Sequence, residues 1–218
     1  AIRAVDHLAK GDPQFGVLLD GLISLRALEA AADYPYWIGR PIETPGSRPL
    51  TFECGPDVGA ELATWPVNHV VKCLVFYHPE DPPELRAAQE RQLLRLADAA
   101  RKTKREWLQE VIAPRERGIG VDTVSSVLQR FYDLGMKPDW WKLEPDDRPE
   151  AWANIERVIA ANDPHCRGVV LLGLSAPEKE LIASFRAAAA SPLVRGFAVG
   201  RTIFADAAQK WLAGKMSD

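Results

Sequence analysis

The stretch DWWKLEP, residues 139–145, has the alternation and closing proline of a short strand, with a lysine at its centre. A strand that buries Lys142 beside two tryptophan rings makes its ammonium costly, so the pKa of this amine is expected to fall. A neutral lysine amine can act as a Schiff-base nucleophile. The alternative is a structural lysine paired with Glu144, which strand alternation puts on the same face. This stretch alone favours the structural interpretation, because ion pairs are more often structural than catalytic.

Composition limits the classes of protein that need to be considered. The chain has 218 residues, of which 47% are hydrophobic and 26% charged, which predicts one globular domain over residues 1–218. A net charge of −3 gives no electrostatic reason to expect nucleic acid or an anionic membrane as a partner. There is no apolar run of ~20 residues and no recognisable signal peptide, so we expect a soluble, cytoplasmic protein.

The cysteines and histidines do not have metal-ligand spacing. Three unevenly spaced cysteines suit a reducing compartment, and four scattered histidines make a zinc site improbable. We therefore predict neither a metal nor another cofactor.

Short apolar strands alternate with amphipathic helices along the whole chain. Strands are predicted at residues 16–21, 36–40, 70–77, 107–112, 139–145, 168–173 and 196–201. Helices are predicted at residues 1–10, 25–32, 58–63, 82–101, 122–134, 149–161, 177–190 and 205–213, with Asp122 as an N-cap. This alternation implies parallel strands with right-handed crossovers.

Seven strands in one series favour a TIM (β/α)8 barrel over a doubly wound sheet. A doubly wound sheet would carry a Gly-rich phosphate loop after its first strand, and none is found there. A barrel needs eight strands, and the chain opens on a helix. We expect the first strand, and the end of the last helix after Asp218, to be missing from this chain.

Ionisable residues occur in or just after several of these strands, and barrel active sites lie at the strands' C-terminal ends. They include Asp20, Lys72, Glu110 and Lys142. In such a group, each lysine is expected to lower the other's pKa while the glutamate moves protons. A structural network remains an alternative, although three ionisable groups in buried strands are expensive without a function.

The last two strands end in residues suited to a phosphate. Gly173 and Gly200 permit close backbone approach, and Arg201 offers a bidentate fork beside a helix that is expected to begin near Phe204. The alternative is that the two glycines merely begin helices and that the arginine lies on the surface. If these two strands were considered alone, this alternative would be preferred.

Several of these segments resemble the tagatose-bisphosphate aldolase type of class I aldolase. They are residues 71–82 (VKCLVFYHPEDP), the strand ending in Glu110, the strand at 142–144 and the strand end at 200–201. The resemblance implies that Lys142 forms the Schiff base, Glu110 is the proton shuttle and Lys72 contacts the reacting oxygens. It also implies that Gly173, Gly200 and Arg201 bind the phosphate.

A closer resemblance covers nearly the whole chain. Residues 17–21, 37–43, 138–145 and 194–204 are similar to the aldolase-like domain C-terminal to bacterial 5-dehydro-2-deoxygluconokinase, in myo-inositol catabolism. This implies cleavage of a phosphorylated sugar acid, 6-phospho-5-dehydro-2-deoxygluconate, to dihydroxyacetone phosphate and malonate semialdehyde. It also implies a fused or associated kinase, and we expect a homo-oligomer. The aspartate that ends the family's first strand has no counterpart here, since Asp6 lies too close to the Asp20 strand.

A second hypothesis comes from a different class of function. The incomplete barrel and the family's frequent fusion to a kinase suggest a non-catalytic phosphosugar-binding domain that regulates or stabilises a fused sugar kinase. A scaffold without a ligand is the least favoured interpretation, because it leaves Lys72 and Lys142 unexplained.

Overall fold

The computed structural model describes residues 2–173 and 178–217, and within them strands and helices alternate. The strands are β1 (Gly16–Leu18), β2 (Trp37–Pro41), β3 (His69–Phe76), β4 (Trp107–Ile112), β5 (Trp140–Leu143), β6 (Gly168–Leu172) and β7 (Val194–Ala198). The helices are α1 (Ile2–Ala9), α2 (Leu25–Ala31), α3 (Val58–Thr64), α4 (Pro83–Thr103), α5 (Thr123–Asp133), α6 (Pro149–Asn162), α7 (Glu178–Ala188) and α8 (Arg201–Leu212), with a 3-10 turn η1 (Arg115–Arg117).

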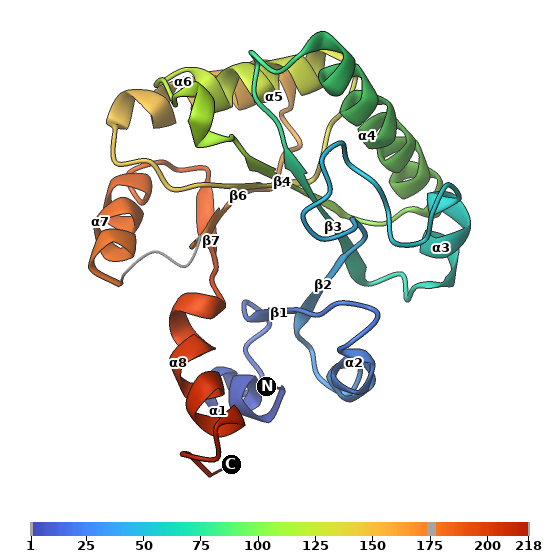
Figure 1. Ribbon diagram of the computed structural model, residues 1–218, viewed down its shortest axis with the longest axis vertical. Coiled ribbons are helices and arrows are strands. Elements are labelled where there is room, and N and C mark those ends of the chain that lie inside the picture. Colours follow the sequence, from blue (N-terminus) through green and yellow to red (C-terminus); the bar gives the residue numbers. More distant parts are fainter. Residues whose placement is uncertain (1, 174–177, 218) are drawn as a thin grey trace.

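All seven strands are parallel and follow one another in chain order across a single sheet. The sheet curves into a nearly closed barrel, with α3 to α6 along its outer side (Figure 1). Among the described residues, no strand pairing joins β1 to β7. The predicted α/β barrel is thus confirmed, while the existence of a further strand stays a prediction.

Alternation along the central strands separates an apolar outer layer from a polar interior. On β3, Val71, Cys73 and Val75 are fully buried in the main hydrophobic cluster, which includes Leu93 and Leu96 of α4. Lys72 has the opposite parity and points to the other side of the strand. The continuous apolar character of β3 is what a strand covered on both faces requires.

One predicted helix start is confirmed in position and one needs correction. Asp122 precedes α5, but its side chain makes no capping hydrogen bond; instead the Thr123 hydroxyl accepts one from the Gly120 amide at 2.8 Å. The last helix begins at Arg201 rather than at residue 205, because the carbonyl of Gly200 already accepts hydrogen bonds from the amides of Ile203 and Phe204.

The other element boundaries differ from the predictions by a few residues. The largest differences are the three-residue β1 and the earlier β7, which ends at Ala198. The predicted helix at 177–190 corresponds to α7, and its predicted first residue, Pro177, lies outside the described residues.

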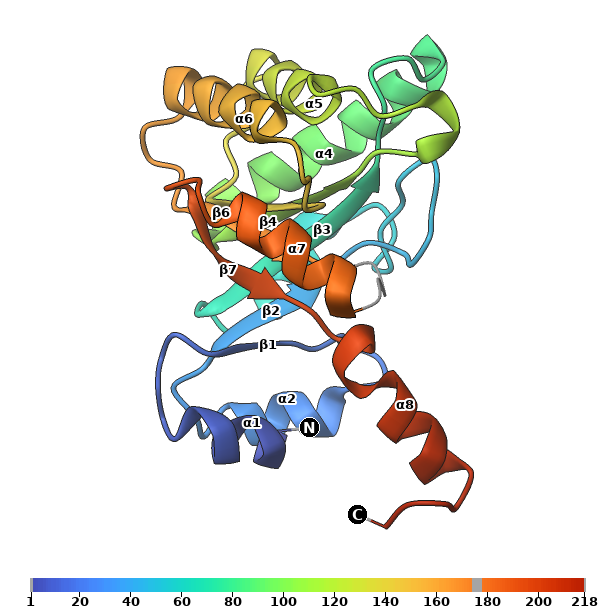
Figure 2. The same ribbon diagram turned by 90° about the vertical axis from the view of Figure 1, so that its left-hand side faces the viewer.

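Helix α8 is packed less closely than the other helices of the C-terminal half. It projects away from α4 to α7 (Figure 2), and no residue along it is buried. Apolar side chains on it remain largely exposed, including Ile203, Phe204 and Trp211. The β7–α8 unit therefore forms an open side of the barrel.

Candidate active site

The two predicted lysines and the predicted glutamate meet inside the barrel. One carboxylate oxygen of Glu110, Oε2, lies 2.7 Å from the Lys72 Nζ, and the other, Oε1, lies 2.9 Å from the Lys142 Nζ. Register explains the meeting, because Glu110 on β4 pairs with Leu74 on β3 and with Lys142 on β5. Each of the three residues is no more than 7% exposed.

A fourth buried group, Glu43, belongs to this cluster and was not predicted. It lies two residues beyond the end of β2, is 5% exposed, and its Oε1 contacts the Lys72 Nζ. Prolines and glycines are frequent between Glu43 and the predicted helix at 58–63, so the sequence indicates a connection there. The position of this carboxylate, just past a strand end, is the sequence feature that could have indicated a site residue. Lys72 is thus held between two carboxylates.

The surroundings of the two lysines shift their pKa values in opposite directions. Burial lowers the pKa of Lys142, and the charge on Lys72 adds to this, against an opposing effect of the Glu110 carboxylate. Burial also acts to lower the pKa of Lys72, but the carboxylates of Glu110 and Glu43 outweigh it and raise the pKa above its ordinary value. The expected lowering of the pKa is therefore found for Lys142 but not for Lys72, because the carboxylates of Glu110 and Glu43 both act on Lys72.

The carboxylate of Glu110 stays ionised between these amines. Burial alone would raise its pKa, but Lys72 and Lys142 together hold the pKa below its ordinary value. The site therefore combines an anionic proton acceptor, a protonated lysine and a lysine that gives up its proton more easily than usual. Separation of pKa values between neighbouring groups is how active sites assign acid and base roles.

The alternative partner for Lys142, Glu144, is directed elsewhere. Its carboxylate accepts a hydrogen bond from the Ala113 amide at 3.2 Å and lies 3.5 Å from the Arg115 guanidinium. Lys142 is paired with Glu110 instead. Glu144 lies one residue beyond β5, and its carboxylate is held by the loop that follows β4.

The predicted phosphate residues lie at the ends of β6 and β7. Gly173 is buried after β6, and a Cβ there would lie 3.0 Å from the Val199 side chain. Gly200 precedes α8, and a Cβ there would lie 2.9 Å from the Phe204 ring. Arg201 is exposed at the first position of α8. Neighbouring side chains therefore pack closely against both glycines.

The carboxylate of Asp20 is hydrogen-bonded within the turn that follows β1. Its carboxylate accepts hydrogen bonds from the amides of Leu22 and Ile23 at 2.9 and 2.6 Å and from the Ser24 hydroxyl at 2.8 Å. Burial opposes ionisation of this group, but these bonds outweigh it and lower its pKa. Asp20 therefore shapes the entry to α2 at the end of β1.

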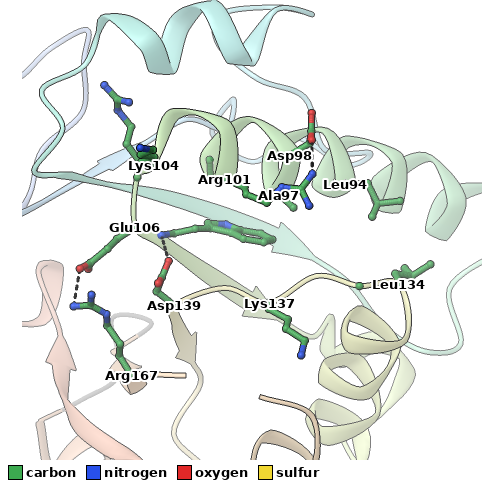
Figure 3. A pocket seen from close by; sticks show the side chains of 14 residues that line it. Leu94, Ala97, Asp98, Arg101, Lys104, Glu106, Leu134, Lys137, Asp139 and Arg167 are labelled. Atoms are coloured by element: carbon green, nitrogen blue, oxygen red, sulfur yellow. Dashed lines mark hydrogen bonds and ion pairs between the residues drawn. The ribbon is translucent and has the colours of Figure 1, made fainter. Parts of the chain in front are cut away.

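A cavity of about 810 Å³ lies at the opposite end of the barrel (Figure 3). Trp107, the first residue of β4, and Asp139 and Arg167, which directly precede β5 and β6, line it. Ion pairs of Arg167 with Glu106 and of Arg101 with Asp98 cross or border the cavity. Because barrel catalysis occurs at the C-terminal ends of strands, this cavity is not assigned to the lysine cluster.

Within residues 2–173 and 178–217, no group of three or more His, Cys, Asp or Glu side chains is arranged to hold a metal ion. None of the helices in the described part of the chain is both long and apolar enough to cross a membrane.

Solved structures share the fold of this chain. The crystal structure of Cgl0159 from Corynebacterium glutamicum (Brevibacterium flavum) matches with a TM-score of 0.66 and 19% identity, over 94% of this chain and 70% of that chain. A fructose-bisphosphate aldolase from Slackia heliotrinireducens matches with a TM-score of 0.53 and 18% identity, over 88% of this chain and 64% of that chain. At these identities the likeness concerns the fold.

The family assignment is more direct. A family model described as "Uncharacterized protein conserved in bacteria (DUF2090)" matches residues 1–218, so the chain belongs to this family. No curated protein matches the sequence.

Proposed function

We propose that this protein is a class I aldolase that cleaves 6-phospho-5-dehydro-2-deoxygluconate to dihydroxyacetone phosphate and malonate semialdehyde. One observation carries the proposal: the carboxylate of Glu110 bridges two buried lysine amines, at 2.7 and 2.9 Å. The aldolase-like fold and the sequence resemblance support it. The identity of the substrate rests on the resemblance.

In the first step the neutral amine of Lys142 attacks the substrate's ketone carbon. The attacking nitrogen loses a proton to the Glu110 carboxylate while the ketone oxygen takes up a proton from solvent, which gives the neutral carbinolamine. Glu110 returns this proton to the departing hydroxyl group, which leaves as water, and an iminium remains on Lys142. The anionic Glu110, which lies 2.9 Å from Nζ, then stabilises the iminium charge.

In the second step the iminium accepts the electrons of the carbon–carbon bond. A carboxylate, Glu110 or the nearby Glu43, takes the proton from the hydroxyl of the carbon that becomes the aldehyde. Lys72, which remains protonated, stabilises the developing negative charge on that oxygen. The resulting enamine is protonated on carbon and hydrolysed, which releases the triose phosphate. Arg201 with the backbone amides near Gly173 and Gly200 would hold the phosphate.

Borohydride trapping tests the covalent step. Reduction of the protein in the presence of dihydroxyacetone phosphate should add one triose-phosphate unit to Lys142, located by peptide mass spectrometry. Lys142→Met should abolish the adduct and the release of triose phosphate. Lys137→Met is the matched control, since Lys137 is exposed and lines the cavity at the far end of the barrel. If the wild type binds the phosphosugar but forms no covalent adduct, the Schiff-base mechanism is rejected.

A non-catalytic phosphosugar-binding domain is the second candidate. It is favoured by one observation: Arg201 is exposed on a helix without buried residues, whereas the lysines are buried. Such a domain would bind dihydroxyacetone phosphate with equal affinity in the wild type and in Lys142→Met, and neither would release triose phosphate from the sugar acid. In the aldolase, Lys142→Met loses turnover while phosphosugar affinity remains.

A further inference from the structure

A second group of charged residues lies at the rim of the barrel, above the lysine cluster. The carboxylate of Asp81, whose side chain is fully buried, accepts hydrogen bonds from the Arg48 Nη2 at 2.5 Å and the Arg117 Nε at 3.0 Å, both at Oδ1. Its other oxygen, Oδ2, accepts one from the His78 amide at 3.0 Å. Both carboxylate oxygens are thereby occupied, and the two guanidinium groups are fixed in position.

These residues come from the loops that follow the active-site strands. Asp81 follows β3, which carries Lys72, and Arg117 ends η1 after β4, which carries Glu110. Arg48 lies in the loop between Glu43 and Phe52, whose backbones form an antiparallel bridge. Loops at the carboxyl ends of parallel barrel strands surround one mouth, so the arginines and the lysines share an entrance.

The arginines keep most of their hydrogen-bonding capacity. A guanidinium has five N–H donors, and each of these two uses one of them on Asp81. The side chains of Arg48 and Arg117 are 32% and 37% exposed, whereas that of Asp81 is inaccessible. The three residues together carry one uncompensated positive charge. The Arg86 Nε donates to the Asp81 carbonyl at 3.1 Å, which brings a third guanidinium to the same loop.

We propose that Arg48 and Arg117, held by Asp81, bind an anionic group at the end of the substrate that becomes the aldehyde product. The inference rests on the proposed aldolase function and narrows the substrate class to ketose phosphates with a second anion. Two anchored guanidiniums can bind a carboxylate or a phosphate by paired hydrogen bonds. A sugar acid and a ketose bisphosphate both supply such a group.

Three substrates with the same triose-phosphate half test the assignment. Fructose 1-phosphate has no second anion, fructose 1,6-bisphosphate has a phosphate, and 6-phospho-5-dehydro-2-deoxygluconate has a carboxylate. Arg48→Gln and Arg117→Gln should raise KM about 10-fold or more for a doubly anionic substrate and leave KM for fructose 1-phosphate and kcat little changed. The substrate with the larger rise identifies the preferred anion.

Arg101→Gln is the matched control, because it removes one arginine charge that is paired with Asp98 outside the mouth. Arg117→Lys keeps the charge but loses the fork, so its KM should be intermediate. The thermal unfolding temperature of each variant is measured together with its kinetics. The proposal is overturned if the variants lose stability while KM for all three substrates stays at the wild-type value, or if KM for fructose 1-phosphate rises equally.

Calorimetric titration with malonate separates this proposal from the proposed function. Malonate should bind the wild type and Arg101→Gln with similar affinity. Its affinity for Arg117→Gln should be lower by about 10-fold or more. If the wild type cleaves no ketose phosphate but shows this pattern, the aldolase proposal fails and the anion site stands. If malonate binds the wild type and Arg117→Gln equally, the anion site fails whatever the turnover.

Discussion

The β3–β5 side of the barrel and the β7–α8 side both carry residues predicted to be functional, but they are built differently. On the first side, Lys72, Glu110 and Lys142 are nearly inaccessible to solvent and in direct contact. On the second, Arg201 is exposed on a helix without buried residues. Low solvent access strengthens electrostatic interactions and shifts pKa values, so chemistry is favoured on the first side and simple charge attraction on the second.

This difference teaches that a predicted catalytic residue and a predicted binding residue depend on the fold to different degrees. Lys142 gains a lowered pKa only through burial and the neighbouring Lys72. A guanidinium, by contrast, does not depend on burial for its charge, because it is not deprotonated in proteins. Substitutions on the two sides should therefore differ in size and in kind.

The largest effect is expected from Glu110→Gln. The change keeps the shape but removes the charge shared by Lys72 and Lys142, so triose-phosphate release should fall about 10²- to 10⁴-fold. Because a buried ion pair is broken, the free energy of unfolding should also fall, by about 3–5 kcal/mol. Steady-state kinetics and urea unfolding measure the two effects. Wild-type activity in this variant would remove Glu110 from the mechanism.

Lys72→Met should change the pH dependence of trapping at Lys142. The neutral amine reacts, so the rate of adduct formation rises with pH through the pKa of Lys142. Loss of Lys72 removes a like charge and leaves Glu43 and Glu110 to favour the protonated amine, so the pKa of Lys142 rises. The profile should therefore move to higher pH than in the wild type. A shift to lower pH would contradict the electrostatic coupling of the two lysines.

The smallest effect on the fold is expected from Arg201→Gln. Since Arg201 is exposed, the free energy of unfolding should change by no more than about 0.5 kcal/mol. Affinity for dihydroxyacetone phosphate should fall about 10-fold, as for a lost charge-assisted hydrogen bond. Calorimetric titration measures the affinity. Arg195→Gln, on β7, is the matched control, and an equal loss there would indicate a diffuse charge effect.

Much of the fold and part of the candidate site could be predicted from local patterns. The apolar run of β3 and the boundaries of β4, residues 107–112, follow from side-chain chemistry alone, and so does the placement of Lys142 on a strand. The start of α8 could not be predicted, because the Gly200 carbonyl accepts the first helical hydrogen bonds although the β-branched Thr202 and Ile203 have low helix propensity. Glu43 was missed for a related reason: it lies outside a strand, in a proline-rich segment.

Strand periodicity and burial are local properties of the chain, so the residue pattern is enough to indicate the order of parallel strands and which of them contain an ionisable residue. The three-dimensional arrangement was needed to show that Glu110 contacts both lysines, that Glu43 joins Lys72, and that Asp81 anchors two arginines at the rim. These contacts depend on strand register and loop closure across the barrel. The pKa of a buried amine is set by such neighbours, which the order of residues does not reveal.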